Sequence, residues 1–305
     1  MTAEGASFVA AMEFLNTRVV PLALILVMGG MGLSLTPADF RRVLLFPKAA
    51  AVGLTTELFG PPLLAFALGY LMAPSPAIAV GAVIVTACAS GVTSNAYSFA
   101  ARADVALCVT LSAITSIVTV FTVPLLTYLA LQFFFERGQM PALPVAQMLR
   151  TLVTVTIIPV AVGMLVRALA PRFAERLLEP LRRMVMVLLI VVLSAAALSS
   201  YDVIRNNLAT AGTLVVLMNL LTMAMGYGVA RLARLPAAQA VTITYEVGVQ
   251  NLALALLITL TILRSPDLAV PALLYAVVMP AVALAFLPVA RRILEAEKIR
   301  PVQVG

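Results

Sequence analysis

Long apolar stretches constrain this chain more than any other feature of its sequence. A bilayer core of about 30 Å needs roughly 20 apolar residues for a helix to cross it. The composition agrees, since 63% of the residues are hydrophobic and 11% are charged, unlike a soluble globular domain. We therefore predict an all-α polytopic membrane protein with about nine transmembrane helices. The expected spans are 19–37, 48–72, 76–101, 104–134, 149–169, 184–200, 207–230, 236–263 and 268–290.

The basic residues predict an orientation in the membrane. Lys and Arg near helix ends favour the cytoplasmic side. With nine spans and the C-terminus inside, 15 of the 20 Lys and Arg residues are cytoplasmic and five are outside. We therefore expect the N-terminus outside and the C-terminus in the cytoplasm. This bias also accounts for the net charge of +7, and no clustered basic face favours nucleic acid.

The sequence predicts an inverted-topology repeat. Asp39 and Asp202 follow similar apolar helices 163 residues apart, and Gly91 and Gly248 lie 157 residues apart. The first span then pairs with the sixth and the third with the eighth, so the two units enter the membrane from opposite sides. Chance similarity between Leu- and Val-rich segments is the alternative. The expected parts are a surface segment 1–18 rather than a signal peptide, a four-helix repeat 19–134, a five-helix repeat 149–290 and a cytoplasmic tail 291–305.

Polar residues interrupt the third and eighth spans at corresponding places. The interruptions are Gly91-Val-Thr-Ser-Asn95 and Glu246-Val-Gly-Val-Gln-Asn251. Glycine costs a helix about 1 kcal/mol relative to alanine, so we expect both helices to unwind at their glycines. Non-helical backbone at this depth is tolerated only where it is buried in protein or lines water. Two matched interruptions indicate a transporter.

Two carboxylates fall well inside the predicted spans, those of Glu57 and Glu246. An ionised carboxylate at mid-membrane costs about 3 kcal/mol or more and needs a partner. No Lys or Arg lies mid-span, so the partner is a cation or a proton; a protonated, hydrogen-bonded glutamate is the structural alternative. Hard cations favour oxygen ligands. Candidate oxygen ligands are Ser94, Asn95, Ser112, Glu246 and Gln250, although any one of them could merely join helices.

Other residue types argue against an enzyme. The chain has no histidine, which intramembrane metalloproteases and rhomboid-like proteases use, and no two aspartates are close in sequence, as prenyl-transfer enzymes require. Its two cysteines, Cys88 and Cys108, lie in apolar spans and are expected to be free thiols. We expect no cofactor. A sensory or structural membrane protein is the other non-enzymatic alternative to a transporter.

Three stretches resemble the bile acid:sodium symporter family, in its bacterial type. They are Gly30-Met-Gly-Leu-Ser-Leu-Thr-Pro-Ala-Asp-Phe40, then Gly91-Val-Thr-Ser-Asn95 running on to Ala101-Arg-Ala-Asp-Val-Ala-Leu107, and Glu246-Val-Gly-Val-Gln-Asn251. The similarity spans about residues 20–290. It implies a panel domain and a core domain, two broken helices that cross in the core, and symport of an organic anion with sodium by alternating access.

The resemblance also implies two sodium sites. One would use Ser94, Asn95, Ser112 and Glu246, with Cys108 where the family commonly has a hydroxyl. The other would use Glu246, Gln250 and the carbonyls of Val247 and Val249, with Glu57 where the family commonly has glutamine. A thiol is a soft ligand for sodium. A second carboxylate beside Glu246 makes proton coupling an alternative to sodium coupling.

The expected substrate is a bile-acid-like anion or a smaller carboxylate, with Thr93 and Asn251 as substrate contacts. An exporter similar to arsenite and auxin carriers is a further alternative, which Cys88 favours. The expected location is a bacterial inner membrane. The sequence leaves the substrate, the stoichiometry and the oligomeric state open.

Overall fold

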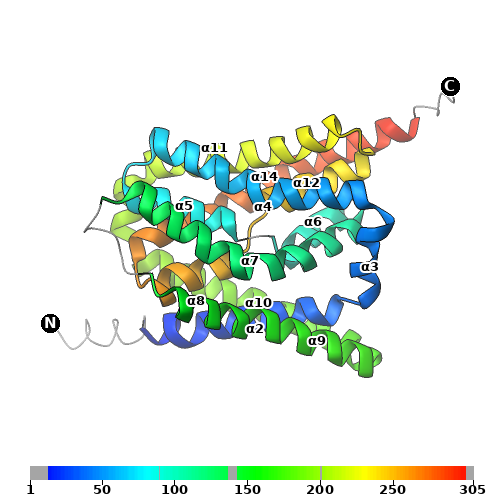
Figure 1. The fold of residues 1–305 in the computed structure, drawn as a ribbon, viewed down its shortest axis with the longest axis horizontal. Coiled ribbons are helices and arrows are strands. Elements are labelled where there is room, and N and C mark those ends of the chain that lie inside the picture. The colour runs from blue at the N-terminus through cyan, green and yellow to red at the C-terminus, as the bar shows by residue number, and fades with distance from the viewer. Residues whose placement is uncertain (1–12, 89, 137–142, 200, 300–305) are drawn as a thin grey trace.

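The computed structural model describes residues 13–299 except 89, 137–142 and 200. These residues are helical almost throughout, which confirms the predicted all-α class (Figure 1). Seven helices in the described part of the chain are long and apolar enough to cross a membrane. They are Thr17–Ser34, Pro47–Met72, Val105–Phe134, Val145–Leu169, Leu208–Leu232, Ala237–Ile262 and Pro266–Glu297.

Each predicted span coincides with helical structure, although three depart from a simple crossing helix. The third is divided into α5 (Pro76–Ala87) and α6 (Val92–Ala101), and the eighth is divided between Gly248 and Leu252. The sixth lies in the longer α10 (Pro171–Ser199). A total of nine crossings stays a prediction. The remaining elements are η1 (Leu15–Val19), α2 (Val20–Ser34), α3 (Pro37–Leu45), α4 (Pro47–Met72), α7 (Val105–Phe134), α8 (Val145–Leu152), η2 (Val153–Ile157), α9 (Ile158–Leu169), α11 (Tyr201–Leu232), α12 (Ala237–Gly248), α13 (Leu252–Leu256), η3 (Leu257–Ile262) and α14 (Pro266–Ile299).

Three helices form a separate layer at the bottom of Figure 1, where α2 packs against α9 and α10. Glycines let two of them touch through their backbones. A side chain on Gly32 of α2 would collide with the carbonyl of Val160, and one on Gly163 of α9 would collide with the carbonyl of Gly29. Close approach through small residues is a common way for helices to associate in lipid. The layer joins helices from both halves of the chain, and the inverted repeat itself stays a prediction.

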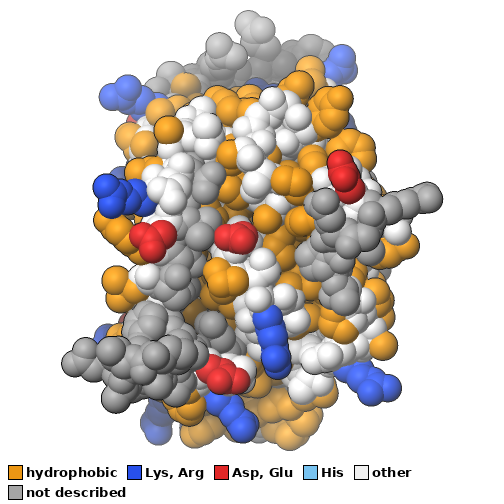
Figure 2. Space-filling model, turned by 90° about the vertical axis from the view of Figure 1, so that its left-hand side faces the viewer, with side chains coloured by type: hydrophobic (Ala, Val, Ile, Leu, Met, Phe, Trp, Pro, Cys, Tyr) orange, Lys and Arg blue, Asp and Glu red, His pale blue; other side chains and the backbone are white. Residues whose placement is uncertain are grey.

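The other helices pack into a larger group in which α11 lies against α4, α12 and α14. Large apolar side chains such as Leu63 of α4 and Phe121 of α7 point outward, as lipid-facing side chains do. Figure 2 shows the end face at the left of Figure 1, where acidic and basic side chains are interspersed with hydrophobic ones. Helix α2 starts towards this end, and α14 finishes at the opposite one (Figure 1).

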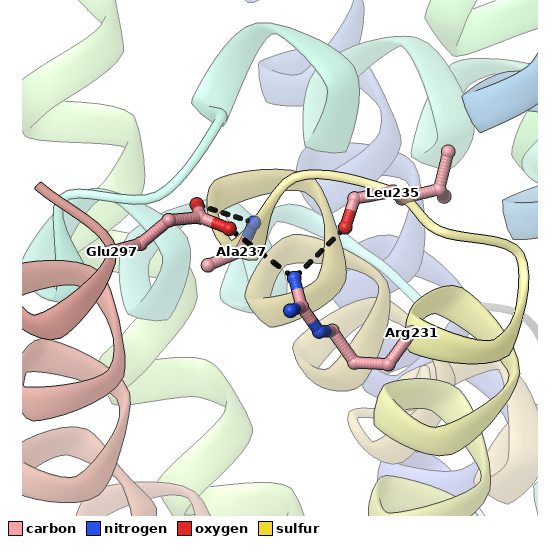
Figure 3. Close-up of polar contacts among 4 residues, drawn as sticks. All are labelled: Arg231, Leu235, Ala237 and Glu297. Atoms are coloured by element: carbon pink, nitrogen blue, oxygen red, sulfur yellow. Dashed lines mark hydrogen bonds and ion pairs between the residues drawn. The ribbon is translucent and has the colours of Figure 1, made fainter. Parts of the chain in front are cut away.

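The last helix continues beyond the predicted span and is bonded to three other helices, α6, α11 and α12. Arg291 of α14 donates from Nε and Nη2 to the carbonyl of Ala100 near the end of α6, at 3.1 and 2.9 Å. Glu297 of α14 accepts a hydrogen bond from the backbone amide of Ala237 at the start of α12, at 2.7 Å, and pairs with Arg231 at 3.3 Å (Figure 3). Residues 291–299, expected in the tail, are therefore helical and attached to the bundle.

Candidate cation site at two helix breaks

The first break separates α5 from α6. Its described residues are Cys88, Ser90 and Gly91, and Gly91 has an extended backbone. The amide of Ser90 donates to Oε1 of Glu57 on α4 at 3.0 Å, so a carboxylate satisfies a backbone group that the helix no longer binds. The Ser94 hydroxyl donates to the carbonyl of Gly91 at 2.8 Å. Polar side chains thus replace the missing helical hydrogen bonds where the helix is interrupted.

The second break separates α12 from α13 and touches the first. Asn251 caps α13, because its Oδ1 accepts a hydrogen bond from the amide of Leu254 at 3.1 Å. The amide of Asn251 donates to the carbonyl of Cys88 at 3.2 Å, which joins the two breaks directly. Helix α6 packs against α12, and α13 packs against α5. The two interrupted helices therefore meet at their interruptions.

Glu246 lies beside this junction and is fully buried. Its Oε1 accepts a hydrogen bond from the Ser112 hydroxyl at 2.5 Å, and its Oε2 accepts one from the Cys108 thiol at 2.9 Å; both donors belong to α7. Neither Glu246 nor Glu57 forms an ion pair within the part of the chain that the structure describes. The carboxylate is solvated by neutral donors alone.

A cluster of three serines connects the two carboxylates. The Ser90 hydroxyl lies 3.0 Å from that of Ser94 and 3.4 Å from that of Ser112, and the last two are 3.5 Å apart. Ser90 therefore contacts Glu57 through its amide, and through Ser112 it reaches Glu246. Sequence reasoning did not select Ser90 as a site residue, although it directly precedes the predicted glycine break.

Buried oxygen atoms without a hydrogen-bond donor gather around the breaks. Such atoms are rare in folded proteins and need an explanation. Four carboxylate or amide oxygens are of this kind among the described residues: Glu57 Oε2, Asn95 Oδ1, Asn219 Oδ1 and Gln250 Oε1. All four are acceptors with lone pairs to offer, and three of them belong to predicted cation ligands. Oxygen acceptors left over in this way fit a hard cation better than another hydrogen-bond donor.

The other predicted site residues are placed as follows. Gln250 donates from Nε2 to the carbonyl of Val247 at 2.9 Å, and both Val247 and Val249 are fully buried. Thr93 is exposed near the start of α6, whereas Asn251 is only 8% exposed. The structure brings Ser94, Cys108, Ser112 and Glu246 together, but no hydrogen bond joins Asn95 to this group in the described chain.

The two cysteines are free thiols, as predicted. Cys108 donates to Glu246 and accepts a hydrogen bond from the Ser98 hydroxyl at 3.3 Å, so it belongs to the polar cluster. The side chain of Cys88 is fully buried within the apolar core. Its burial gives no support to thiol ligation of a cargo at the first break.

Comparison with known proteins identifies the family to which this molecule belongs. Residues 21–207 match the Sodium Bile acid symporter family. The chain belongs to this family, which confirms the resemblance predicted from the three motifs. A family of transporters, together with the apolar helices, makes this an integral membrane protein.

Individual relatives extend the match beyond residue 207. The chain is 28% identical over 269 residues to a probable sodium/metabolite cotransporter, BASS2, of Oryza sativa subsp. japonica chloroplasts, which covers 87% of this chain and 62% of the relative. It is 27% identical over 277 residues to the sodium-dependent transporter YocS of Bacillus subtilis, covering 90% and 83%. It is 26% identical over 257 residues to the ileal sodium/bile acid cotransporter of Oryctolagus cuniculus, covering 81% and 73%.

Proposed function

We propose that this protein is a sodium-coupled symporter of an organic anion. The observation that carries the proposal is the buried Glu246 carboxylate at the contact between the two breaks, surrounded by neutral donors and by oxygens without donors. An ionised carboxylate at this depth needs a positive charge close by. A sodium ion supplies that charge and binds the same kinds of oxygen.

The first cation would bind among Ser94, Ser112 and Glu246, whose side chains already form one cluster. Cys108 occupies the place of a further oxygen ligand and contributes a softer atom. The second cation would bind Glu246, Gln250 and the carbonyls of Val247 and Val249. Sharing of Glu246 by both sites makes the two binding events interdependent.

The substrate would bind next to the cations, at Thr93 and Asn251. Thr93 is exposed at the start of α6, where the helix dipole favours an anionic group. The named relatives include cotransporters of metabolites and of bile acid. Met279 lies at the second break, where its Sδ accepts a hydrogen bond from the amide of Gln250 at 3.3 Å, and it makes this side of the site apolar. A small or amphipathic carboxylate fits such a surface.

Alternating access is supported by an asymmetry between the halves of the broken helices. The halves α13 and η3 pack against α2 of the three-helix layer, whereas α6 packs mainly against α7, α12 and α14. Relative movement of the layer and the larger helix group would expose the breaks from one side and then from the other. The basic residues favour placing the end of α14 in the cytoplasm of a bacterial inner membrane.

A thermal stability titration tests the cation site. A ligand that binds only the folded state raises apparent stability by RT ln(1 + L/Kd), where L is the free ligand concentration. We expect sodium, but not potassium at equal ionic strength, to raise the melting temperature of the purified protein in detergent. Glu246→Gln should abolish the rise while the protein stays folded, and Glu175→Gln on the surface of α10 is the matched control. A sodium response that survives in Glu246→Gln would exclude this site.

Proton coupling is the second candidate, and the position of Glu57 favours it. Its Oε2 has no donor, and the serine cluster links it to Glu246. Two carboxylates so linked repel each other unless a cation or a shared proton lies between them. Stabilisation by acid rather than by sodium, lost in Glu57→Gln, would support this function in place of sodium coupling.

A further inference from the structure

A polar network outside the predicted sites converges on the second break. Asn219 of α11 and Tyr275 of α14 are both fully buried. Asn219 donates from Nδ2 to the carbonyl of Gly248 at 2.8 Å and to the hydroxyl of Tyr275 at 2.8 Å. The Tyr275 hydroxyl in turn donates to the same carbonyl at 2.9 Å. The two hydrogens of the Asn219 amide and the hydrogen of the Tyr275 hydroxyl are therefore all used, either in bonds to the Gly248 carbonyl or in the bond between the two side chains.

The break leaves several backbone amides and carbonyls without their helical partners, and they bind other groups. The amide of Gln250 donates to Met279 Sδ instead of continuing the helix, and the amide of Asn251 donates to Cys88. The carbonyl of Val247 accepts a hydrogen bond from the side chain of Gln250 at 2.9 Å. The carbonyl of Gly248, by contrast, accepts two hydrogen bonds, which occupy both of its lone pairs. Gly248 is thus the carbonyl at this break that has nothing left to offer a cation.

Packing around Gly248 shows that its position is fixed from the other side as well. A side chain at this residue would collide with Cγ of Met223, which is on α11 one turn beyond Asn219. Val249 follows with an extended backbone, φ −104° and ψ 119°. Successive groups of an extended segment point to opposite sides. Holding the Gly248 carbonyl towards α11 and α14 therefore turns the Val249 carbonyl away from them.

We propose that Asn219 and Tyr275 are positioning residues for cation binding. By holding the Gly248 carbonyl out of the site, they set the direction of the Val247 and Val249 carbonyls and of Glu246, which lies two residues before Gly248. This inference rests on the proposed sodium site, because it assigns a role within that site. It explains why two polar side chains are buried in otherwise apolar helices, where each would cost free energy without its hydrogen bonds.

Tyr275→Phe is the sharpest test, because it removes one donor and keeps the ring. The matched control is Tyr245→Phe, which removes another fully buried hydroxyl, one that donates to the carbonyl of Ala283 at 3.4 Å and does not contact the break. Two quantities are measured for both variants. One is the sodium dissociation constant, fitted to the rise in melting temperature with sodium concentration, and the other is hydrogen exchange of residues 246–252 without sodium.

We expect Tyr275→Phe to raise the sodium dissociation constant about five- to tenfold, as the loss of one buried hydrogen bond predicts. Exchange of residues 246–252 should also become faster, and Tyr245→Phe should change neither quantity. Asn219→Leu removes both amide donors and keeps the branching of the side chain, and it should have the larger effect of the two network variants if it folds.

The outcomes separate this inference from the proposed function. If Tyr275→Phe lowers overall stability but leaves both the sodium affinity and the local exchange unchanged, the network is merely structural and the inference is overturned. If the natural protein does not respond to sodium, the proposed function fails. Faster exchange confined to residues 246–252 in Tyr275→Phe would then still support positioning of the break, and unchanged exchange would overturn it.

Discussion

The two helix breaks look alike in sequence but lie in different surroundings. After the first break, α6 presents Thr93 and Phe99 at its surface, and Phe99 is 74% exposed. In the second interrupted helix, residues 240–251 and 253–260 are all buried. The first break supplies hydroxyl groups, and the second supplies a carboxylate and amides. Similar breaks therefore need not have similar surroundings: both are buried, but the half-helix α6 that follows the first reaches accessible space, whereas α13, which follows the second, is largely buried.

The glycines at the two breaks also differ in the space around them. A side chain at Gly91 would make only ordinary contacts, the nearest being 3.8 Å from Nδ2 of Asn251, and its φ of −128° suits any residue. At Gly248 a side chain would meet Met223 in the core. Gly91 is thus compatible with substitution, whereas Gly248 is required by close packing. This contrast can be tested directly.

The largest expected effect is that of Gly248→Ala. Overpacking a filled core costs about 1–3 kcal/mol, and here the displaced backbone also carries the cation ligands. We expect a lower melting temperature and loss of sodium stabilisation. Gly91→Ala should leave both nearly unchanged. Equal sensitivity of the two variants in the same thermal titration would remove the difference between the breaks.

Glu57→Gln should have the next largest effect, on pH dependence. A proton on Glu57 and a cation at Glu246 compete, so sodium affinity of the natural protein should fall as the pH is lowered. The titratable neighbours linked to Glu57 through the serines are Glu246 and Cys108. With glutamine at position 57 the profile should flatten, as measured by sodium titrations between pH 5 and pH 8. A profile of unchanged slope would show that Glu57 takes no part in coupling.

Cys108→Ser should produce a smaller change, a gain in sodium affinity. A hydroxyl replaces the thiol next to Glu246 and gives sodium a harder ligand. We expect the sodium dissociation constant to fall a few-fold. Cys88→Ser, which alters a thiol away from the serine cluster, is the control. An increase in the required sodium for Cys108→Ser would mean that the thiol orients Glu246 better than a hydroxyl does.

Thr93→Val should have the smallest effect on cation binding. Thr93 is exposed and lies outside the serine cluster, so sodium stabilisation should persist in this variant. Substrate transport in liposomes should instead need a several-fold higher anion concentration for half-maximal rate. Loss of the sodium response would place Thr93 among the cation ligands and would blur the distinction between the two breaks.

The sequence predicted the position of both breaks, because glycine and clustered polar residues are unusual within apolar spans. It also selected Ser94, Ser112, Cys108 and Glu246, which the structure brings into one cluster. The sequence did not predict a role for Asn219 and Tyr275, because each stands alone in its apolar stretch. A single polar residue in such a stretch is typical of an ordinary hydrogen bond between helices. Only the fold shows that both side chains meet the same backbone oxygen.

The attachment of α14 to two half-helices constrains how the larger helix group can deform. Arg291 holds the end of α6, and Glu297 holds the beginning of α12. Any rearrangement that pulled these two half-helices apart would first have to break both attachments. We therefore expect α6, α12 and α14 to move together as one rigid body. A spectroscopic label near Ile299 would then report a displacement of the distant breaks.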